Sequence, residues 1–292
     1  MNPEAVRQRQ IARNCRALSR VLTRPWANKE GNLFCYDFDA DAFTWSASRT
    51  LFAEGRLDPG KVETWLADTI EDPLGAIRPR LSGEDPTALD DWKFFKAAVL
   101  MVWLQGGWFQ FALAEDVRQD LDRLAAMSTG ELDDLVAAVK QELTLRLVFT
   151  TSPGDSIAPI FVPSSGIFPF AFPDPGCISE HSIGIGLPLD VHCALVLLPA
   201  DREGEAALPL LKPLLSNASI GSSESRRVVL PPNLLGAMDE RDAARILRDQ
   251  REQSEARVAD VREVRRAVLE TFENLGIRTK VDRTGRILRT PA

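Results

Sequence analysis

The sequence predicts an α+β protein: a helical amino-terminal half with a small β-hairpin, a mostly antiparallel sheet in the middle, and a long carboxy-terminal helix before a terminal hairpin. Apolar residues recur at helical steps through residues 1–146. Residues 147–232 lack that period and are dense in proline, glycine, serine and β-forming residues. Helical spacing returns over 238–275. We therefore expect a single α+β domain over 1–275 and a basic hairpin or tail over 276–292.

The composition is that of a folded protein in a reducing compartment. The chain has 292 residues, 45% of them hydrophobic and 26% charged, which is enough for a sizeable core. Its four cysteines include no CxxC pair and do not form a disulfide framework. Charged residues stand where a signal peptide has its apolar core, so secretion is not indicated. We therefore expect a cytoplasmic protein.

The amino-terminal residues predict a helix followed by a hairpin. Sparse apolar positions give residues 4–22 helical character, and Pro25 ends that segment. Strands are expected over Leu33–Phe38 and Phe43–Ser46, joined by a turn at Asp39–Asp41.

One face of this predicted hairpin is aromatic. Tyr36, the only tyrosine of the chain, lies on the same strand face as Phe34 and Phe38. An aromatic recess suits a ligand, and Tyr36 is therefore a candidate binding residue.

Helices are expected over most of the next hundred residues. Lys61–Leu81 has an apolar stripe at steps of three and four residues, and Pro73 is expected to kink or split it. Two more helices are expected between Leu121 and Leu143. Ser128 and Glu131 form a capping box for the second of them.

The segment Phe94–Ala114 is nearly as long and apolar as a membrane span. Lys96 and the Gly106-Gly107 pair interrupt it, and its flanks are acidic where a span has basic anchors. We therefore expect a central buried helix and no membrane partner.

Composition changes at Leu147, where the strand-and-loop region begins. The predicted strands are Arg146–Thr151, Ala158–Val162, Ile183–Leu187, Val191–Leu198 and Arg226–Leu230.

The carboxy-terminal helix is expected over Met238–Leu275. Its stretch Arg248–Glu255 has no apolar face, which indicates a solvated bridge or a break. The tail predicts a basic hairpin that turns near Thr284-Gly285. The expected packing stripe of the second half consists of Val261, Val264, Val268, Phe272 and Leu275.

Charge is distributed unevenly along the chain. The net charge is −7, yet residues 1–24 and 276–292 are both rich in arginine, so the part between them is acidic. Basic ends attract nucleic acids or acidic partners. Aromatic residues are not interleaved with the first arginines, which leaves out the stacking half of a single-strand binding surface. Nucleic-acid binding is therefore possible but not favoured.

Two groups of residues are candidates for chemistry. Thr151, Ser152 and Asp155 follow a predicted strand, where binding loops commonly emerge, although Ser and Asp also favour ordinary turns. The second group is a short window with both histidines of the chain, namely Cys177, His181, Asp190, His192 and Cys193.

The histidine window does not predict a closed metal site. His192 and Cys193 are adjacent, and adjacent residues of a strand point to opposite faces. Three ligands remain, which is too few for structural zinc, while a catalytic metal with an open position stays an alternative. Cys193 alternates with apolar neighbours and is interpreted as a core residue. We expect no cofactor and assign no metal ligand.

Three pieces of the chain resemble the bacterial family known as domain of unknown function 4238. They are Leu18–Asp37 with the turn at Gly31, Leu147–Pro159 with the later Pro-Leu-Asp that ends at Asp190, and Asn233 with the helix that follows it. The resemblance implies an architecture and adds Asn233 as a binding residue, but it implies little about activity.

This chain departs from the family pattern at two places. The family usually has a histidine where Arg13-Asn14-Cys15 stands, and a Ser-Asp-Asn-Pro turn where Ser152 is followed by Pro153-Gly154-Asp155. Both departures remove polar groups that a catalytic reading of the family requires.

Two functions remain open. Nucleotide-binding loops, the hydrolase elbow and the zinc-protease helix motif are absent from the sequence. The leading hypothesis is an intracellular binding or regulatory protein that holds a small molecule or a protein between the sheet loops and the hairpin. The alternative is a hydrolase with its site at the loops of residues 150–193. It would be metal-assisted or Asp/His-based, with a nuclease as one version, and its catalytic residues would be Asp155, His181, Asp190 and His192.

Overall fold

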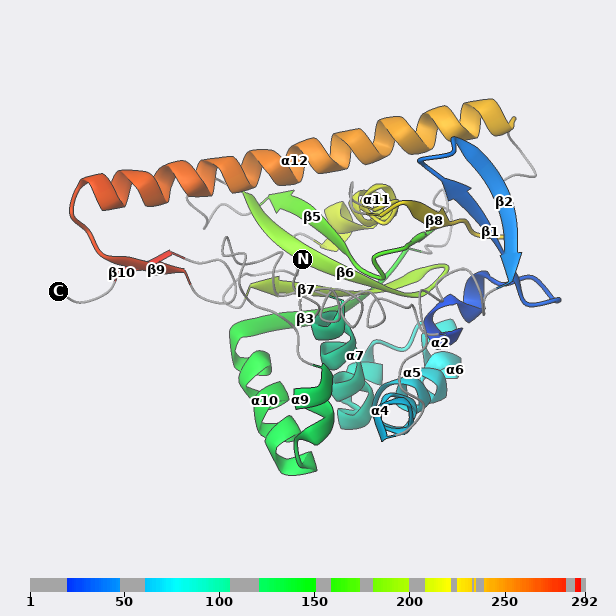
Figure 1. The fold of residues 1–292 in the computed structure, drawn as a ribbon, viewed down its shortest axis with the longest axis horizontal. Coiled ribbons are helices and arrows are strands. Elements are labelled where there is room, and N and C mark those ends of the chain that lie inside the picture. Colours follow the sequence, from blue (N-terminus) through cyan, green and yellow to red (C-terminus); the bar gives the residue numbers. More distant parts are fainter. Residues whose placement is uncertain are drawn as a thin grey trace, which may run out of the picture.

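Two four-stranded antiparallel sheets, a helical layer and one long helix make up this α+β protein (Figure 1). The structure is a computed structural model. Its helices and antiparallel sheets confirm the predicted fold class. It describes residues 20–47, 61–105, 121–150, 159–173, 181–199, 208–221, 225–232, 234, 239–281 and 287–289.

The larger core lies on the sheet that we call the main sheet. Its strand order is β3 (Leu143–Phe149), β7 (Cys193–Pro199), β6 (His181–Asp190) and β5 (Phe168–Pro173), with every neighbouring pair antiparallel. Three of these strands overlap the predicted ones. The strand β5, which contains two prolines, was not predicted from the sequence. Its position at the edge of the sheet explains how a strand with prolines fits.

The predicted hairpin is confirmed, but it belongs to a second sheet. Strands β1 (Asn32–Asp37) and β2 (Ala42–Ala47) pair antiparallel around the expected turn. On its other side β1 pairs with β8 (Arg227–Val229), which pairs with the two-residue β4 (Val162–Pro163). We call these four strands the hairpin sheet. The predicted strand Ala158–Val162 is therefore mostly irregular where it is described.

Two glycines of β6 allow the edge strand to pack. Gly184 is paired with Phe170, and Gly186 is paired with Phe168. A Cβ atom at Gly184 would lie 2.4 Å from the Phe170 ring, and one at Gly186 would lie 2.2 Å from the Phe168 ring. The rings thus lie flat over the glycines and cover the backbone, the arrangement called aromatic rescue.

Short helices form the layer under the main sheet. The predicted helix Lys61–Leu81 is interrupted, as expected. A π-helical stretch ends at Glu71, directly before the α-helical turn that contains Pro73, and the backbone stays right-handed helical across this boundary. A turn at Ile77 then ends the segment that contains Pro73. The elements are α2 (Arg20–Thr23), η1 (Arg24–Trp26), α4 (Lys61–Leu66), η2 (Ala67–Glu71), α5 (Asp72–Ala76), α6 (Arg78–Ser82) and η3 (Pro86–Asp90).

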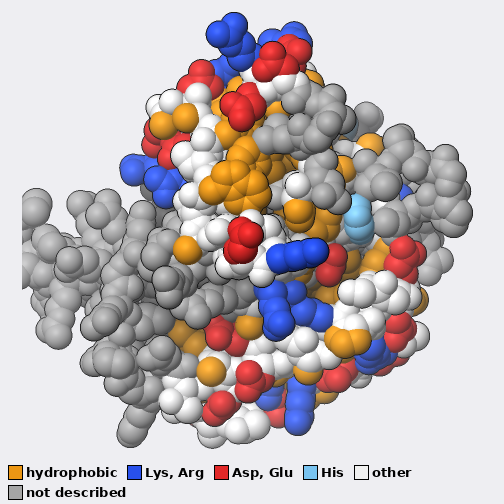
Figure 2. Space-filling model, turned by 90° about the vertical axis from the view of Figure 1, so that its right-hand side faces the viewer, with side chains coloured by type: hydrophobic (Ala, Val, Ile, Leu, Met, Phe, Trp, Pro, Cys, Tyr) orange, Lys and Arg blue, Asp and Glu red, His pale blue; other side chains and the backbone are white. Residues whose placement is uncertain are grey.

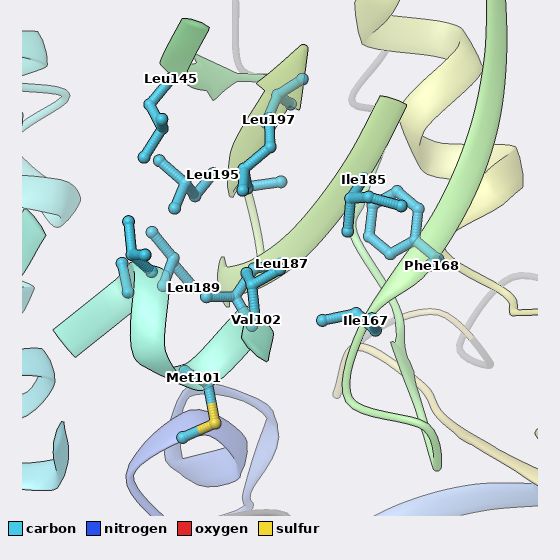
Figure 3. Packing of buried hydrophobic residues seen from close by; sticks show 14 of the residues in the cluster. Met101, Val102, Leu145, Ile167, Phe168, Ile185, Leu187, Leu189, Leu195 and Leu197 are labelled. Atoms are coloured by element: carbon cyan, nitrogen blue, oxygen red, sulfur yellow. The ribbon is translucent and has the colours of Figure 1, made fainter. Parts of the chain in front are cut away.

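The central buried helix is confirmed as α7 (Trp92–Leu104), although residues 106–120 of the region lie outside the described part. Figure 3 shows Val102 of α7 on the side of the main sheet from which Leu145, Leu187 and Leu195 point. Among the described helices, none combines the length and apolarity of a membrane span.

The expected helix pair follows as α9 (Leu121–Ala126) and α10 (Thr129–Glu142). The capping box at Ser128 and Glu131 is formed as predicted, with both reciprocal hydrogen bonds. A helix not anticipated from the sequence is α11 (Leu208–Ala218), which contains Pro213. It lies on the opposite face of the main sheet from α7 (Figure 1).

The carboxy-terminal helix α12 (Glu240–Asn274) is continuous over 35 residues, roughly 50 Å, and crosses both sheets (Figure 1). The alternative of a break at Arg248–Glu255 is wrong. Arg251 packs its guanidinium 4.1 Å from the centre of the Phe38 ring and bonds Glu255 at 2.9 Å. A long cationic side chain thus replaces the missing apolar face.

The predicted stripe of α12 is partly wrong. Val264 and Leu275 are exposed, whereas Val258, Val261 and Arg265 are buried. After α12 the predicted terminal hairpin is confirmed by the pairing of β9 (Thr279–Val281) with β10 (Ile287–Arg289). Its expected turn lies outside the described residues.

Candidate functional site

One irregular segment, Pro159–Phe161, brings the amino-terminal helices to the end of the main sheet. The indole N–H of Trp26 donates to the carbonyl oxygen of Ile160 at 2.8 Å. The amide of Ile160 in turn donates to the carbonyl oxygen of Val191, in the turn between β6 and β7, also at 2.8 Å. Trp26 is buried, so this link is shielded from water. The turn η1 therefore lies beside the β6–β7 turn.

The same segment is held on its other side by α11. The hydroxyl of Ser216 donates to the carbonyl oxygen of Pro159 at 2.7 Å, and the amide of Phe161 donates to the hydroxyl of Ser219 at 2.9 Å. The backbone between the two sheets is thus satisfied by side chains although it belongs to no regular element. This fixes the position of η1 relative to the main sheet.

A pocket of about 350 Å³ opens where α2 and η1 meet α5 and α6. Its apolar wall consists of Val21, Gly75 and Ala76. Its charged residues, given together, are Arg24, Arg78, Glu71 and Asp72. We call it the arginine pocket. Figure 2 views the molecule from the side on which α2 and α6 lie in Figure 1, and basic side chains gather at the middle of that face with acidic ones around them.

The two guanidinium groups of the pocket lie close enough to repel each other. Arg78 is half-buried, and burial lowers its pKa from the usual range. The carboxylate of Asp190 acts against that shift, while the positive charge of Arg24 adds to it. Arg78 therefore lies within electrostatic range of both Arg24 in η1 and Asp190 at the end of β6.

The charges of the pocket are not paired with one another. In the described part of the chain, the side chains of Arg24, Arg78, Glu71 and Asp72 take part in no hydrogen bond or ion pair. A half-buried guanidinium without a partner is unusual, because burying a charge is costly unless it is paired.

The β6–β7 turn itself carries two of the predicted catalytic residues. The carboxylate of Asp190 accepts a hydrogen bond from the Val191 amide at 2.7 Å, and the His192 carbonyl accepts one from the Thr150 amide at 2.8 Å. Two side-chain atoms here, Nδ1 of His192 and Oγ1 of Thr150, are buried without a hydrogen-bond partner in the described structure. This end of the main sheet therefore contains unsatisfied polar groups.

The structure separates the two predicted histidines. His181 begins β6 and Asp190 ends it, so they lie roughly 30 Å apart along one strand. His181 therefore does not share a cleft with Asp190 and His192. The other predicted residues, Thr151, Ser152, Asp155, Cys177 and Asn233, lie outside the described residues.

Tyr36 is part of the core between the hairpin sheet and α12. Its side chain is fully buried, and its hydroxyl donates to the carboxylate of Asp41, which also accepts a hydrogen bond from Arg248 at 2.5 Å. Burial and the hydrogen bond to Asp41 raise the pKa of Tyr36 to about 12. A ligand cannot reach this ring in the observed arrangement. The aromatic recess expected at the hairpin is filled by α12.

The remaining cysteine predictions concern the core. Cys193 is buried and burial raises the pKa of its thiol, which agrees with its interpretation as a small core residue. Within the described ranges, His, Cys, Asp and Glu side chains form no group of three or more that could hold a metal ion.

The sequence reasoning missed the arginine pocket. Arg24 was considered only among the basic residues of the amino terminus, and Arg78 was not considered. A local signal does exist: both arginines precede a proline, Pro25 and Pro79, and both Arg-Pro pairs begin a short helical turn. That signal places each arginine at the start of a turn, but it does not say that the two turns meet.

Comparisons with known proteins add no relative. Protein-family models, curated proteins and solved structures were all compared with the chain, and none matches it. The resemblance to the 4238 family therefore stays a prediction.

Proposed function

We propose that this protein is an intracellular binding protein for a small anionic ligand, which it holds in the arginine pocket. One observation carries the proposal: the half-buried guanidinium of Arg78 lies beside Arg24 and has no ion-pair partner in the described structure. The anionic group of a ligand would supply that partner and relieve the repulsion between the two cations.

Chemistry and size both support this proposal. Guanidinium groups present a planar fork of N–H donors that matches a carboxylate or phosphate with two parallel hydrogen bonds. The volume of about 350 Å³ falls at the small end of ligand pockets, which span roughly 300–1,000 Å³. The two described cysteines, Cys35 and Cys193, are free buried thiols, in keeping with a reducing compartment.

The test is anion binding by the wild type and by Arg78→Gln. Phosphate, sulfate and succinate are titrated at constant ionic strength, with the melting temperature and calorimetric heat as readouts. We expect at least one anion to raise the melting temperature of the wild type, and Arg78→Gln to lose at least tenfold in affinity. Arg266→Gln, which removes an exposed arginine of α12, is the matched control and keeps the wild-type affinity. An anion that binds wild type and Arg78→Gln with equal, measurable affinity refutes the proposal.

A hydrolase is the second candidate, and one observation favours it. The buried atoms Nδ1 of His192 and Oγ1 of Thr150 have no partner in the described structure, and such orphaned polar groups mark places where a substrate or water completes the network. Asp190 lies in the same turn. His181 has no part in this version, because it lies at the far end of β6.

The hydrolase candidate is tested with three chromogenic substrates: p-nitrophenyl acetate, p-nitrophenyl phosphate and bis-p-nitrophenyl phosphate. We expect His192→Asn to abolish any turnover while the fold, followed by circular dichroism, is retained. Turnover that survives in His192→Asn, or its absence in the wild type, eliminates this candidate.

A further inference from the structure

We propose that the ligand of the arginine pocket is a zwitterion of the α-amino acid class, with its carboxylate on Arg24 and Arg78 and its ammonium group on Glu71 and Asp72. This inference rests on the proposed function and extends it from an anion to a ligand of defined charge pattern. It begins from the composition of the wall: two arginines and two acidic residues are among the residues that line one small pocket.

The arrangement of these charges is the first argument. Oppositely charged side chains in such a small space normally form ion pairs, yet none of the four is engaged in one in the described structure. The two arginines come from η1 and α6, and the two acidic residues come from the junction of η2 and α5. A ligand with two opposite charges can bridge them.

The pair of acidic residues is the second argument. Carboxylates in the wall would repel a ligand that carries only negative charge, and they would weaken the anion binding that Arg24 and Arg78 favour. The ammonium group of an amino acid turns that repulsion into attraction. The same two carboxylates then discriminate against simple carboxylic acids and phosphate, which is specificity by unfavourable contacts with the wrong ligand.

The apolar wall sets the size of the ligand. Val21 and Gly75 face each other, and a Cβ atom added at Gly75 would lie 3.9 Å from Cγ1 of Val21. An alanine side chain is therefore accommodated without a clash, but it takes space from the pocket. Gly75→Ala is thus a probe of pocket size that leaves all four charges in place.

The experiment separates the two charges of the ligand. The twenty L-amino acids are screened by thermal shift, and the best binder is compared by calorimetry with its 2-oxo acid, which lacks the ammonium group, and its decarboxylated amine. We expect the amino acid to bind at least tenfold more tightly than either. In Glu71→Gln/Asp72→Asn, amino acid and 2-oxo acid should bind equally, whereas Glu263→Gln on the exposed face of α12 keeps the difference.

The outcomes distinguish this inference from the proposed function. If the 2-oxo acid binds the wild type as tightly as the amino acid, the zwitterion is refuted and the anion pocket stands. If neither these compounds nor phosphate, sulfate or succinate bind, both are refuted. The melting temperature of each ligand-free variant shows that it is folded. Gly75→Ala gives an independent readout: it should weaken the binding of amino acids with long side chains at least tenfold more than it weakens the binding of glycine.

Discussion

Two arginines form short ion pairs with aspartates at the hairpin turn. Arg227 bonds Asp37 at 2.7 Å, and Arg248 reaches from α12 to Asp41, which Tyr36 also contacts. These hydrogen bonds hold the pKa of Asp41 below its usual range, first through Tyr36 and then through Arg248. The turn therefore connects the hairpin sheet to α12 through charged groups. The protonation of Asp41 should therefore affect the stability of this connection.

Acid should weaken the connection at Asp41. A carboxylate whose pKa is lowered on folding contributes stability that is fully present above its unfolded pKa, near 3.8, and is lost as pH falls through the lower folded value. The melting temperature of Asp41→Asn should thus lie below that of the wild type at pH 6, and the two should converge below roughly pH 3.

Asp39→Asn is the control for this measurement. Asp39 lies 3.7 Å from Arg226 with both side chains largely exposed, so its pair is weak. Its melting temperature should follow the wild type at every pH. A gap between wild type and Asp41→Asn that stays constant from pH 6 to pH 3 contradicts the expected role of Asp41.

The glycines under the phenylalanine rings should tolerate no side chain. A methyl group at Gly184 or Gly186 must displace a ring of β5 that lies closer than van der Waals contact allows. We expect Gly184→Ala and Gly186→Ala each to lower the free energy of unfolding by about 1–3 kcal/mol in urea denaturation. Gly130→Ala, at an open position in α10, should be neutral or stabilise by up to about 1 kcal/mol. Wild-type stability of both β6 variants would show that the rings move freely.

In the part of α12 that has no apolar face, a cationic side chain packs the helix against the hairpin sheet. In its first half, Ala244 and Leu247 pack on the small core under the hairpin sheet, and Arg251 extends this contact over Phe38. The stretch from Arg248 to Glu255 looks unsupported when only apolar residues are considered. It is supported once the aliphatic part and the flat guanidinium of arginine are counted as packing surface.

Removing this contact should destabilise the protein. Arg251→Gln loses the contact with Phe38 and the ion pair with Glu255, and we expect the free energy of unfolding to fall by about 1 kcal/mol. Arg257→Gln, an exposed arginine of the same helix, should change it by less than about 0.5 kcal/mol. Urea denaturation followed by circular dichroism measures both, and equal effects would argue against a specific role for the Phe38 contact.

The molecule as a whole is held together between its sheets by irregular backbone. Trp26 bonds the segment Pro159–Phe161, which also bonds the β6–β7 turn and α11. The arginine pocket lies on the other side of η1, where that turn meets α2, η2, α5 and α6. Its geometry is thus a property of the assembled fold and not of any one helix or strand.

Trp26→Phe tests this link. The variant keeps an aromatic ring but loses part of the buried indole and leaves the buried carbonyl oxygen of Ile160 without its donor, so we expect a loss of about 1–3 kcal/mol in unfolding free energy. Because Arg24 is carried by the same turn, anion affinity at the pocket should also fall. Ser128→Ala, which removes the distant helix cap of α10, should destabilise by about 1 kcal/mol without changing anion affinity.

Local sequence signals predicted much of this fold. The hairpin around Asp39–Asp41, the helix cap at Ser128, the strands β6 and β7 and the helix α12 all follow from patterns within a dozen neighbouring residues. The strand β5 was not predicted. Prolines are compatible with a strand only at special positions such as the edge of a sheet, and the sequence of a strand does not show whether it will lie at an edge. The pocket was not expected: it lies among the short helices α2, η1, η2, α5 and α6, whereas the sequence pointed to the space between the sheet loops and the hairpin.

The chain on its own thus determined the type and approximate bounds of the hairpin, α7, α10, β6, β7 and α12, because hydrogen bonding and apolar periodicity act over short distances in sequence. Tertiary structure alone decided that β1 pairs with β8, nearly two hundred residues later, that Tyr36 is covered by α12, and that Arg24 meets Arg78. Such contacts depend on how apolar faces from distant segments pack together, and no local pattern records which faces will meet.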